Sequence, residues 1–176
     1  MWRPWHHRPV ARGGDPQRPT TQILPHLDAA YNLARWLMRD PTRAEDVVQD
    51  AVLRAISAEA GFRGGDARAW LLRIVRNTAY DALSANRRSR EDELDETLAD
   101  PSADAETLMA QREDLAYLAT ALEALPLEWR EAMVLRELEG LSYREIADIT
   151  GTPIGTVMSR LSRARVALLR SREARA

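Results

Sequence analysis

The residues with the clearest chemical use lie between positions 152 and 172, where hydroxyls and arginines recur on one side of an expected helix. On a helical wheel of about 100° per residue they fall opposite an apolar face. Hydroxyls can hydrogen-bond base edges in the major groove of DNA, and arginines can bind guanine or phosphate. The pattern therefore predicts a DNA-binding face. This face is made of Gly155, Thr156, Ser159, Ser162 and Arg163, with Arg160 at its edge.

A helix-turn-helix would position that face. Ser142 and Glu145 have the spacing of a capping box, which starts the first of its two helices. Gly151 suits a tight turn, and Thr152 and Pro153 suit the cap and the first position of the second helix. An ordinary arginine-rich, solvated helix would not need small residues and serines held away from the core. The expected buried seam of the second helix is Ile154, Val157, Leu161, Ala164 and Leu168.

A second basic face is expected on a long helix over residues 67–88. Arginines interleaved with an aromatic ring suit unpaired DNA, whose bases stack and whose phosphates need neutralising. Asn77 and Asp81 share the stripe of Trp70 and Ile74, where a buried polar group would need a partner. The residues of the basic face are Arg73, Arg76, Tyr80 and Arg87.

A third candidate surface lies on a helix that runs to about Ser57. We expect this helix to start with a capping box of Thr42 and Glu45. Its apolar side carries valines and alanines. Its polar side places an exposed Leu53 beside acidic residues, a combination that favours docking of a basic partner helix over a merely solvated face. The polar side consists of Asp46, Gln49, Asp50 and Leu53.

The helical periodicity extends through the chain and predicts an all-α fold of two small helical domains. Residues 1–19 are rich in proline and glycine and read as a disordered leader. Domains are expected over 20–90 and 113–172, joined by a flexible acidic linker over 91–112. The formal net charge is −2, but residues 153–176 carry six arginines against one acid, which suits an anionic partner.

Several function classes are excluded or disfavoured by composition. The chain has no cysteine, which rules out disulfides and thiolate metal sites, and its three histidines do not suggest a metal. We see no nucleophile motif and no phosphate-binding glycine loop, so we expect neither an enzyme nor a bound cofactor. No apolar run approaches the roughly 18 residues that span a bilayer, so we expect a cytoplasmic protein without membrane insertion.

Three segments in order, AEDVVQDA, FRGG…WLLRIVRNTAYDAL and LEWREAMVLRELEGLSYREIADITGTPIGTVMSRLSRAR, closely resemble the extracytoplasmic-function sigma factors of bacteria. The resemblance covers about residues 20–172. It implies an alternative sigma factor that directs core RNA polymerase to promoters and assists their melting. The implied partners are core polymerase, promoter DNA and an anti-sigma factor.

The resemblance also implies roles for matching residues. The polar side around Asp50 would contact polymerase, and Thr152 to Arg163 would read the minus-thirty-five element. Family members often carry a base-reading arginine or aromatic where this chain has Met158 and Ser162. Residues implied to bind the minus-ten element are Phe62, Arg63, Asp66, Arg73, Arg76, Asn77, Tyr80 and Arg87. The alternative is a helix-turn-helix regulator that works without polymerase and uses its N-terminal part to dimerise or bind a ligand.

Overall fold

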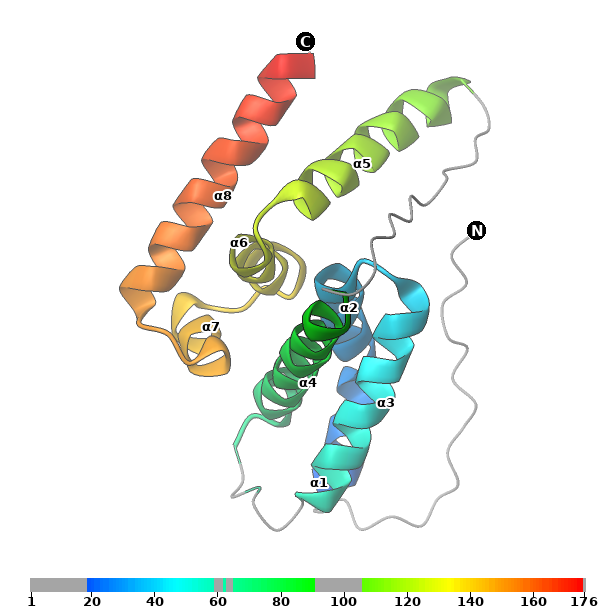
Figure 1. Ribbon diagram of the computed structural model, residues 1–176. Helices are drawn as coiled ribbons and strands as arrows, with labels where there is room; N and C mark the ends of the chain where they lie inside the picture. Colours follow the sequence, from blue (N-terminus) through cyan, green and yellow to red (C-terminus); the bar gives the residue numbers. More distant parts are fainter. Residues whose placement is uncertain (1–18, 59–61, 63–64, 91–105, 176) are drawn as a thin grey trace.

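The computed structural model describes residues 19–58, 62, 65–90 and 106–175, and all regular elements in these ranges are helices (Figure 1). The predicted all-α class is therefore confirmed. Most of the expected leader, and residues 91–105 of the expected linker, lie outside the described residues. The described helices form an N-terminal unit and a C-terminal unit that contact each other.

The N-terminal unit packs three main helices, α2 (Leu27–Met38), α3 (Pro41–Ser57) and α4 (Ala67–Arg90), with short α1 (Pro19–Ile23) and η1 (Leu24–His26) beside them. Its core is formed by buried aliphatic side chains at helical spacing. The largest of them are Ile23, Leu33, Leu37, Leu71, Leu72 and Val75. Burial of these side chains fixes which faces of α3 and α4 remain free for partners.

The turn between α2 and α3 corrects one prediction. Arg39 adopts a left-handed conformation with φ of 59° and ends α2. Asp40 then caps α3 by accepting a hydrogen bond of 3.0 Å from the backbone N–H of Arg43. The predicted capping box of Thr42 and Glu45 is therefore wrong, because Pro41 has no N–H to satisfy and allows the helix to begin before Thr42.

The C-terminal unit consists of α5 (Glu106–Ala124), α6 (Leu127–Met133), η3 (Val134–Leu138), α7 (Tyr143–Thr150) and α8 (Ile154–Arg175). Helix α5 begins earlier than the expected start near 113, since residues 106–112 are mostly good helix formers. Directly after α6, the chain continues as η3, a short π-helical segment. Leu161, Ile146 and Leu135 are fully buried in this unit, where α8 packs on α6 and α7 and where α7 also contacts η3.

The two units pack together through α4 against α7 and through α2 against α6 and η3. Figure 1 shows α6 and α7 beside α2 and α4, whereas α5 and α8 extend away from them. None of the helices in the described ranges is long and apolar enough to cross a membrane.

The turn between α7 and α8 offers a stability test at Gly151, whose φ is +65° and whose Cβ position is open space. Gly151→Ala should lower the free energy of unfolding by about 1 kcal/mol, because an L residue is strained in this conformation. Gly155→Ala is the matched control: it lies inside α8 with equal space and should stabilise by about 0.5–1 kcal/mol. Urea titration of both variants measures this, and the same sign of effect for both would contradict it.

Candidate functional site

The predicted helix-turn-helix is present in α7 and α8. Ser142 and Glu145 form the full capping box, with bonds of 2.7 and 3.3 Å, and those bonds lower the pKa of the exposed Glu145 carboxyl. Gly151 ends α7 in the left-handed conformation. The hydroxyl of Thr152 lies 2.9 Å from that of Thr150, so it ties the turn to α7. Helix α8 begins at Ile154, directly after Pro153.

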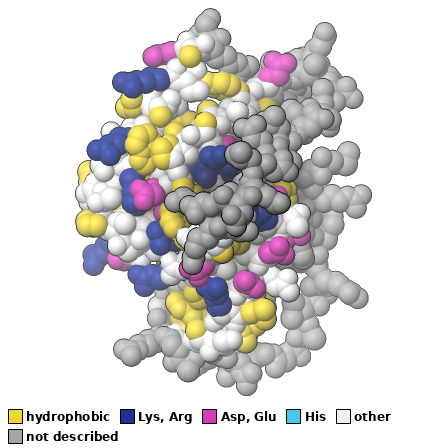
Figure 2. Space-filling model, viewed as in Figure 1, with side chains coloured by type: hydrophobic (Ala, Val, Ile, Leu, Met, Phe, Trp, Pro, Cys, Tyr) yellow, Lys and Arg dark blue, Asp and Glu magenta, His cyan; other side chains and the backbone are white. Residues whose placement is uncertain are grey.

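Helix α8 separates an inner seam from an outer face, much as its sequence predicts. Val157, Leu161 and Ala164 are at most 1% exposed. Gly155, Ser162 and Arg163 are exposed, and Thr156 and Ser159 are half-buried. The predicted DNA-reading residues are therefore displayed together along one helix. Figure 2 shows blue arginine side chains over this part of the molecule, with yellow apolar side chains between them.

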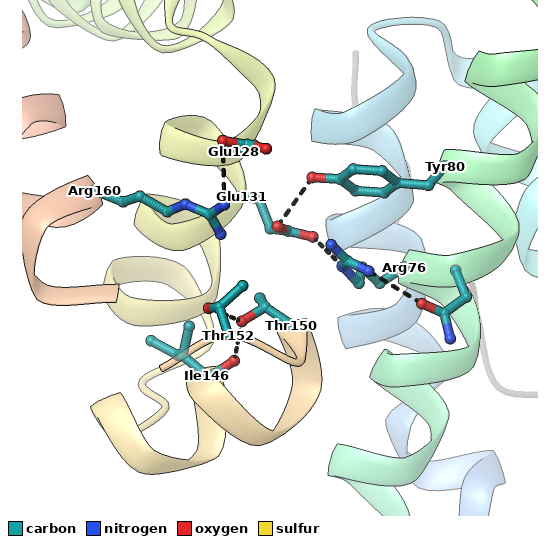
Figure 3. Close-up of polar contacts among 9 residues, drawn as sticks. Arg76, Tyr80, Glu128, Glu131, Ile146, Thr150, Thr152 and Arg160 are labelled. Carbon is teal, nitrogen blue, oxygen red and sulfur yellow. Dashed lines mark hydrogen bonds and ion pairs between the residues drawn. The ribbon is translucent and has the colours of Figure 1, made fainter. Parts of the chain in front are cut away.

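Two details of α8 differ from expectation. Ile154 is 45% exposed rather than buried, because it stands at the open N-terminal end of the helix, and Met158 is 53% exposed on the same helix. Arg160 is only 15% exposed and forms an ion pair of 3.1 Å with Glu128 of α6 (Figure 3). Arg160 thus ties α8 to α6 in this structure.

The basic face predicted on α4 is partly covered: Arg76 and Tyr80 are half-buried against the C-terminal unit, whereas Arg73 is exposed. Arg76 donates to Glu131 Oε1 at 2.9 Å, and the hydroxyl of Tyr80 donates to Glu131 Oε2 at 3.1 Å (Figure 3). The guanidinium of Arg76 lies 4.2 Å from the centroid of the Tyr80 ring. Arg73 donates to the backbone carbonyl of Asp148 in α7. Of the expected arc, Arg76 and Tyr80 are therefore brought together on Glu131, and Arg73 contacts α7 instead.

Glu131 is an acidic side chain with no exposed surface. Burial raises the pKa of its carboxyl, and the opposing effects of Arg76 and of the two hydrogen bonds do not cancel that rise. Burial and Glu131 together raise the pKa of the Tyr80 hydroxyl, which therefore stays protonated and donates. The three groups form a compact charged centre between α4 and α6.

A second polar contact lies along the same seam. Arg68 of α4 pairs with Glu139 at 2.6 Å and also donates to the Glu139 backbone carbonyl at 2.9 Å. Asn32 of α2 donates to the other carboxylate oxygen of Glu139. Farther along, Arg39 donates to the backbone carbonyl of Glu123. The C-terminal unit thus presents carboxylates and carbonyls to the basic side of the N-terminal unit.

The remaining residues expected at the minus-ten site are distributed differently. Asn77 is exposed and accepts from Arg76 at 3.2 Å. Asp81, expected on the Trp70 stripe, is exposed and pairs with Arg54 of α3 at 2.8 Å, because α4 turns this edge toward solvent. Asp66 caps the start of α4, and Phe62 packs on Trp70 at 4.8 Å between ring centroids. Arg63 and the side chain of Arg87 lie outside the described residues.

The third predicted surface is free. Asp46, Gln49 and Asp50 are exposed along α3, and Leu53 is 55% exposed, as the sequence predicts. A shallow hollow of about 440 Å³ adjoins them. It is lined by Asp50, Leu53, Arg54, Ser57 and Ala58. An apolar side chain bordered by carboxylates is thus available to a partner.

One apolar surface was not anticipated. Leu115 and Leu118 of α5 are 66% and 46% exposed. Between them in the sequence, Tyr117 lies with its hydroxyl 2.6 Å from that of Ser171 in α8, so the two helices are bridged there. An open hollow of about 860 Å³ lies between α5 and α8. Its apolar lining includes Leu118, Ala121, Leu168 and Leu169. The sequence shows that these residues are apolar, but it does not show how α5 and α8 lie relative to each other.

Comparison with known families matches both units. The family described as sigma-70 region 2 matches residues 23–89, and the family described as sigma-70, region 4 matches residues 115–168. The RNA polymerase sigma-H factor of Pseudomonas aeruginosa is 35% identical over 167 residues, covering 88% of this chain and 86% of that protein. The ECF RNA polymerase sigma-E factor of Escherichia coli K12 is 41% identical over 134 residues, 70% of each chain.

Solved structures agree with these matches. The sigma factor RpoE from Bartonella quintana, in complex with the anti-sigma factor NepR, is 33% identical with a TM-score of 0.74, covering 87% of this chain and 95% of that one. CnrH, in complex with the cytosolic domain of CnrY, is 28% identical with a TM-score of 0.63, covering 90% and 89%.

Proposed function

Because the chain belongs to the extracytoplasmic-function (ECF) family of RNA polymerase sigma factors, we propose that three of its surfaces divide the work of promoter recognition. The protein is an alternative sigma factor, which brings core polymerase to specific promoters. Nothing in its relatives favours a regulator that works without polymerase. The family does not say which residues of this chain carry out each task, and the assignment of three surfaces below is based on the residues of this chain.

The observation that carries the proposal is the two-sided character of α8. Its inner seam is almost completely buried, while Gly155, Ser162 and Arg163 are exposed side by side after a tight helix-turn-helix turn. A recognition helix in a major groove needs this arrangement, since it must be rigidly held and must present hydroxyls and cations to bases and phosphates. We assign this face to the duplex minus-thirty-five element.

The other two surfaces belong to the N-terminal unit. We assign the exposed side of α3, with Asp46, Asp50 and Leu53, to docking on core polymerase. We assign the α4 face of Arg73, Arg76 and Tyr80 to the unpaired strand of the minus-ten element, with the exposed Asn77 as a contact for an extruded base. Base extrusion costs only a few kcal/mol, so promoter melting needs no hydrolysis by this chain.

Further assignments rest on the family. Sigma factors are initiation factors, and we assign no catalytic residue. Of the two solved relatives named above, one is bound to the anti-sigma factor NepR and the other to the cytosolic domain of CnrY. We propose that this chain likewise binds an anti-sigma factor. We also place it in the cytoplasm, where polymerase acts. Separately folded units over 20–90 and 113–172 remain part of this proposal.

The division between the two DNA-binding surfaces is tested by Arg163→Ala and Asn77→Ala in the polymerase complex. Arg163→Ala should weaken capture of the duplex element and lower the salt slope of binding by about one, as one phosphate contact is lost. Asn77→Ala should spare duplex capture and impair opening. On a promoter pre-melted over the minus-ten element, the Arg163 defect should persist and the Asn77 defect should shrink only partly.

Permanganate footprints on closed and pre-melted templates measure both effects. Glu113→Gln, at an exposed residue of α5 that belongs to neither surface, is the control and should behave as wild type. Identical footprints for the two alanine variants would show that the surfaces are not divided in this way.

A further inference from the structure

Two exposed apolar side chains stand at the start of the helix that we assign to duplex DNA. Ile154 and Met158 are 45% and 53% exposed. In the part of the chain that the structure describes, neither belongs to the apolar core or to the partly buried residues packed against it. Because they are four residues apart in α8, they lie next to each other on one side of the helix. Together they form an exposed apolar pair that the fold itself does not use.

The apolar pair directly borders the residues assigned to base reading. Gly155 and Ser159 each follow a member of the pair by one position, so they form a parallel row farther round the helix. Gly155 and Ser162 are exposed, and a Cβ added at Gly155 would meet no described atom within 4 Å. Small residues beside the pair let α8 approach a ligand closely enough for Ile154 and Met158 to touch it.

The charge around the apolar pair favours DNA over an apolar protein surface as this ligand. From Ile154 to Arg172, α8 carries five arginines and no acid. Arg163, one turn after Ser159, is exposed. An apolar pair on a cationic helix suits a partner that presents phosphates and apolar groups together. The major groove does so at thymine, whose C5 methyl group lies on the exposed edge of the base.

The place of the pair within α8 also suits contact with bases. Ile154 and Met158 are the first and fifth residues of the helix, and residues near the N-terminal end of a recognition helix are those that reach base edges. A step of four residues advances about 6 Å along a helix, which is comparable to two base-pair steps of about 3.4 Å each. The two side chains can therefore reach methyl groups on neighbouring or next-but-one base pairs.

We propose that Ile154 and Met158 are specificity-determining residues, which recognise the C5 methyl groups of thymines in the major groove of the minus-thirty-five element. The inference rests on the proposed assignment of α8 to that duplex element and deepens it. The hydroxyls and arginines of α8 select hydrogen-bonding base edges and hold phosphates. The apolar pair adds a preference for thymine on a defined strand.

The contacted thymines are located first, by selection. Core polymerase reconstituted with the full chain selects binders from promoter duplexes that are randomised over the minus-thirty-five segment. The wild-type chain should select thymine at neighbouring or next-but-one base pairs. The double variant Ile154→Ala, Met158→Ala should lose that preference and keep the others. Because both side chains are exposed, the variant should fold, and circular dichroism checks this.

Replacement of each selected thymine by deoxyuridine then removes only the methyl group. Loss of one buried methyl contact should weaken binding of the wild-type complex about three- to fivefold, measured by competition with the thymine duplex. In the double variant, the same replacement should change affinity by less than about 1.5-fold, because the partner of the methyl group is already absent. Leu169→Ala, which truncates a 57%-exposed side chain farther along α8, is the control and should keep the wild-type ratio of the two affinities.

Two results would overturn thymine reading. One is that deoxyuridine weakens binding equally in the wild type and the double variant, or that no selected position prefers thymine. The other is that the double variant loses affinity for core polymerase in the absence of DNA, which would mean that the apolar pair docks on protein.

Failure of the α8 assignment is seen separately with Arg163→Ala. This change should weaken capture of the selected duplex with thymine and with deoxyuridine alike, because it removes a phosphate contact. If Arg163→Ala has no effect, the α8 assignment is wrong and thymine reading falls with it. If Arg163→Ala weakens capture while the effect of deoxyuridine is the same in the wild type and the double variant, the assignment stands and thymine reading is wrong.

Discussion

Charge reversal at Asp50 should abolish assembly with core polymerase while leaving the fold intact. Asp50 is exposed on α3 beside Leu53, which is 55% exposed. Within the described part of the chain, the fold therefore does not depend on the Asp50 carboxylate. Disrupting a charge pair that becomes buried at an interface costs about 2–5 kcal/mol, or roughly 30- to 4,000-fold in Kd. Titration of labelled core polymerase with Asp50→Arg measures the loss.

Glu113→Arg is the control for this experiment. Glu113 is exposed on α5, outside the assigned docking side, so its reversal should change Kd by less than about threefold. Leu53→Ala should fall between the two, because it removes apolar area without introducing a repulsive charge. Wild-type affinity of the Asp50→Arg variant would show that α3 does not dock on polymerase.

Helix positions and the helix-turn-helix were accessible from the sequence because they depend on local chemistry. The spacing of Ser142 and Glu145 encodes a capping box that needs no tertiary contact, and Gly151 marks a turn that needs positive φ. The buried seam of α8 follows from a period of 3.6 residues. The exposure of Leu53 could be predicted for the same reason, because the apolar residues of α3 recur on one side of the helix and Leu53 lies on the other.

Features that depend on how helices meet were not accessible. Leu118 is an apolar residue of α5, yet it is exposed in the open hollow that α5 and α8 line together. Arg130 is 3% exposed, although arginine is rarely buried and the sequence gives no sign of what would pair with it. It donates to the carbonyls of Glu123 and Leu125 at the end of α5, and burial lowers its pKa only to about 10, so it keeps its charge at neutral pH.

The pairing of Glu131 with Arg76 is the most important contact that the sequence did not predict. Both residue types were visible in the sequence, and the arc of arginines and Tyr80 on α4 was predicted. Their partner was not, because the two residues are separated by 55 positions and no local pattern relates them. A basic face assigned to a nucleic acid can equally be satisfied by carboxylates of the same chain, and only the packing of the units shows which is present.

The second large effect is expected at Leu161, which is 1% exposed in the inner seam of α8. Leu161→Ala should lower the free energy of unfolding of the C-terminal unit by about 2–5 kcal/mol, since a buried leucine loses both transfer energy and packing. Leu169→Ala is the control on the same helix: Leu169 is 57% exposed, and its truncation should cost less than about 0.5 kcal/mol.

Hydrogen exchange followed by mass spectrometry locates this loss. If the units fold separately, exchange in Leu161→Ala should rise in α7 and α8 and stay unchanged in the core of α2, α3 and α4, because those helices bury apolar side chains of their own against one another. The variant should also lose duplex minus-thirty-five binding while retaining its affinity for core polymerase through α3. An equal rise in exchange throughout α2 to α4 would instead mean that the chain unfolds as one cooperative body, and the assignment of two separately folded units would have to be abandoned.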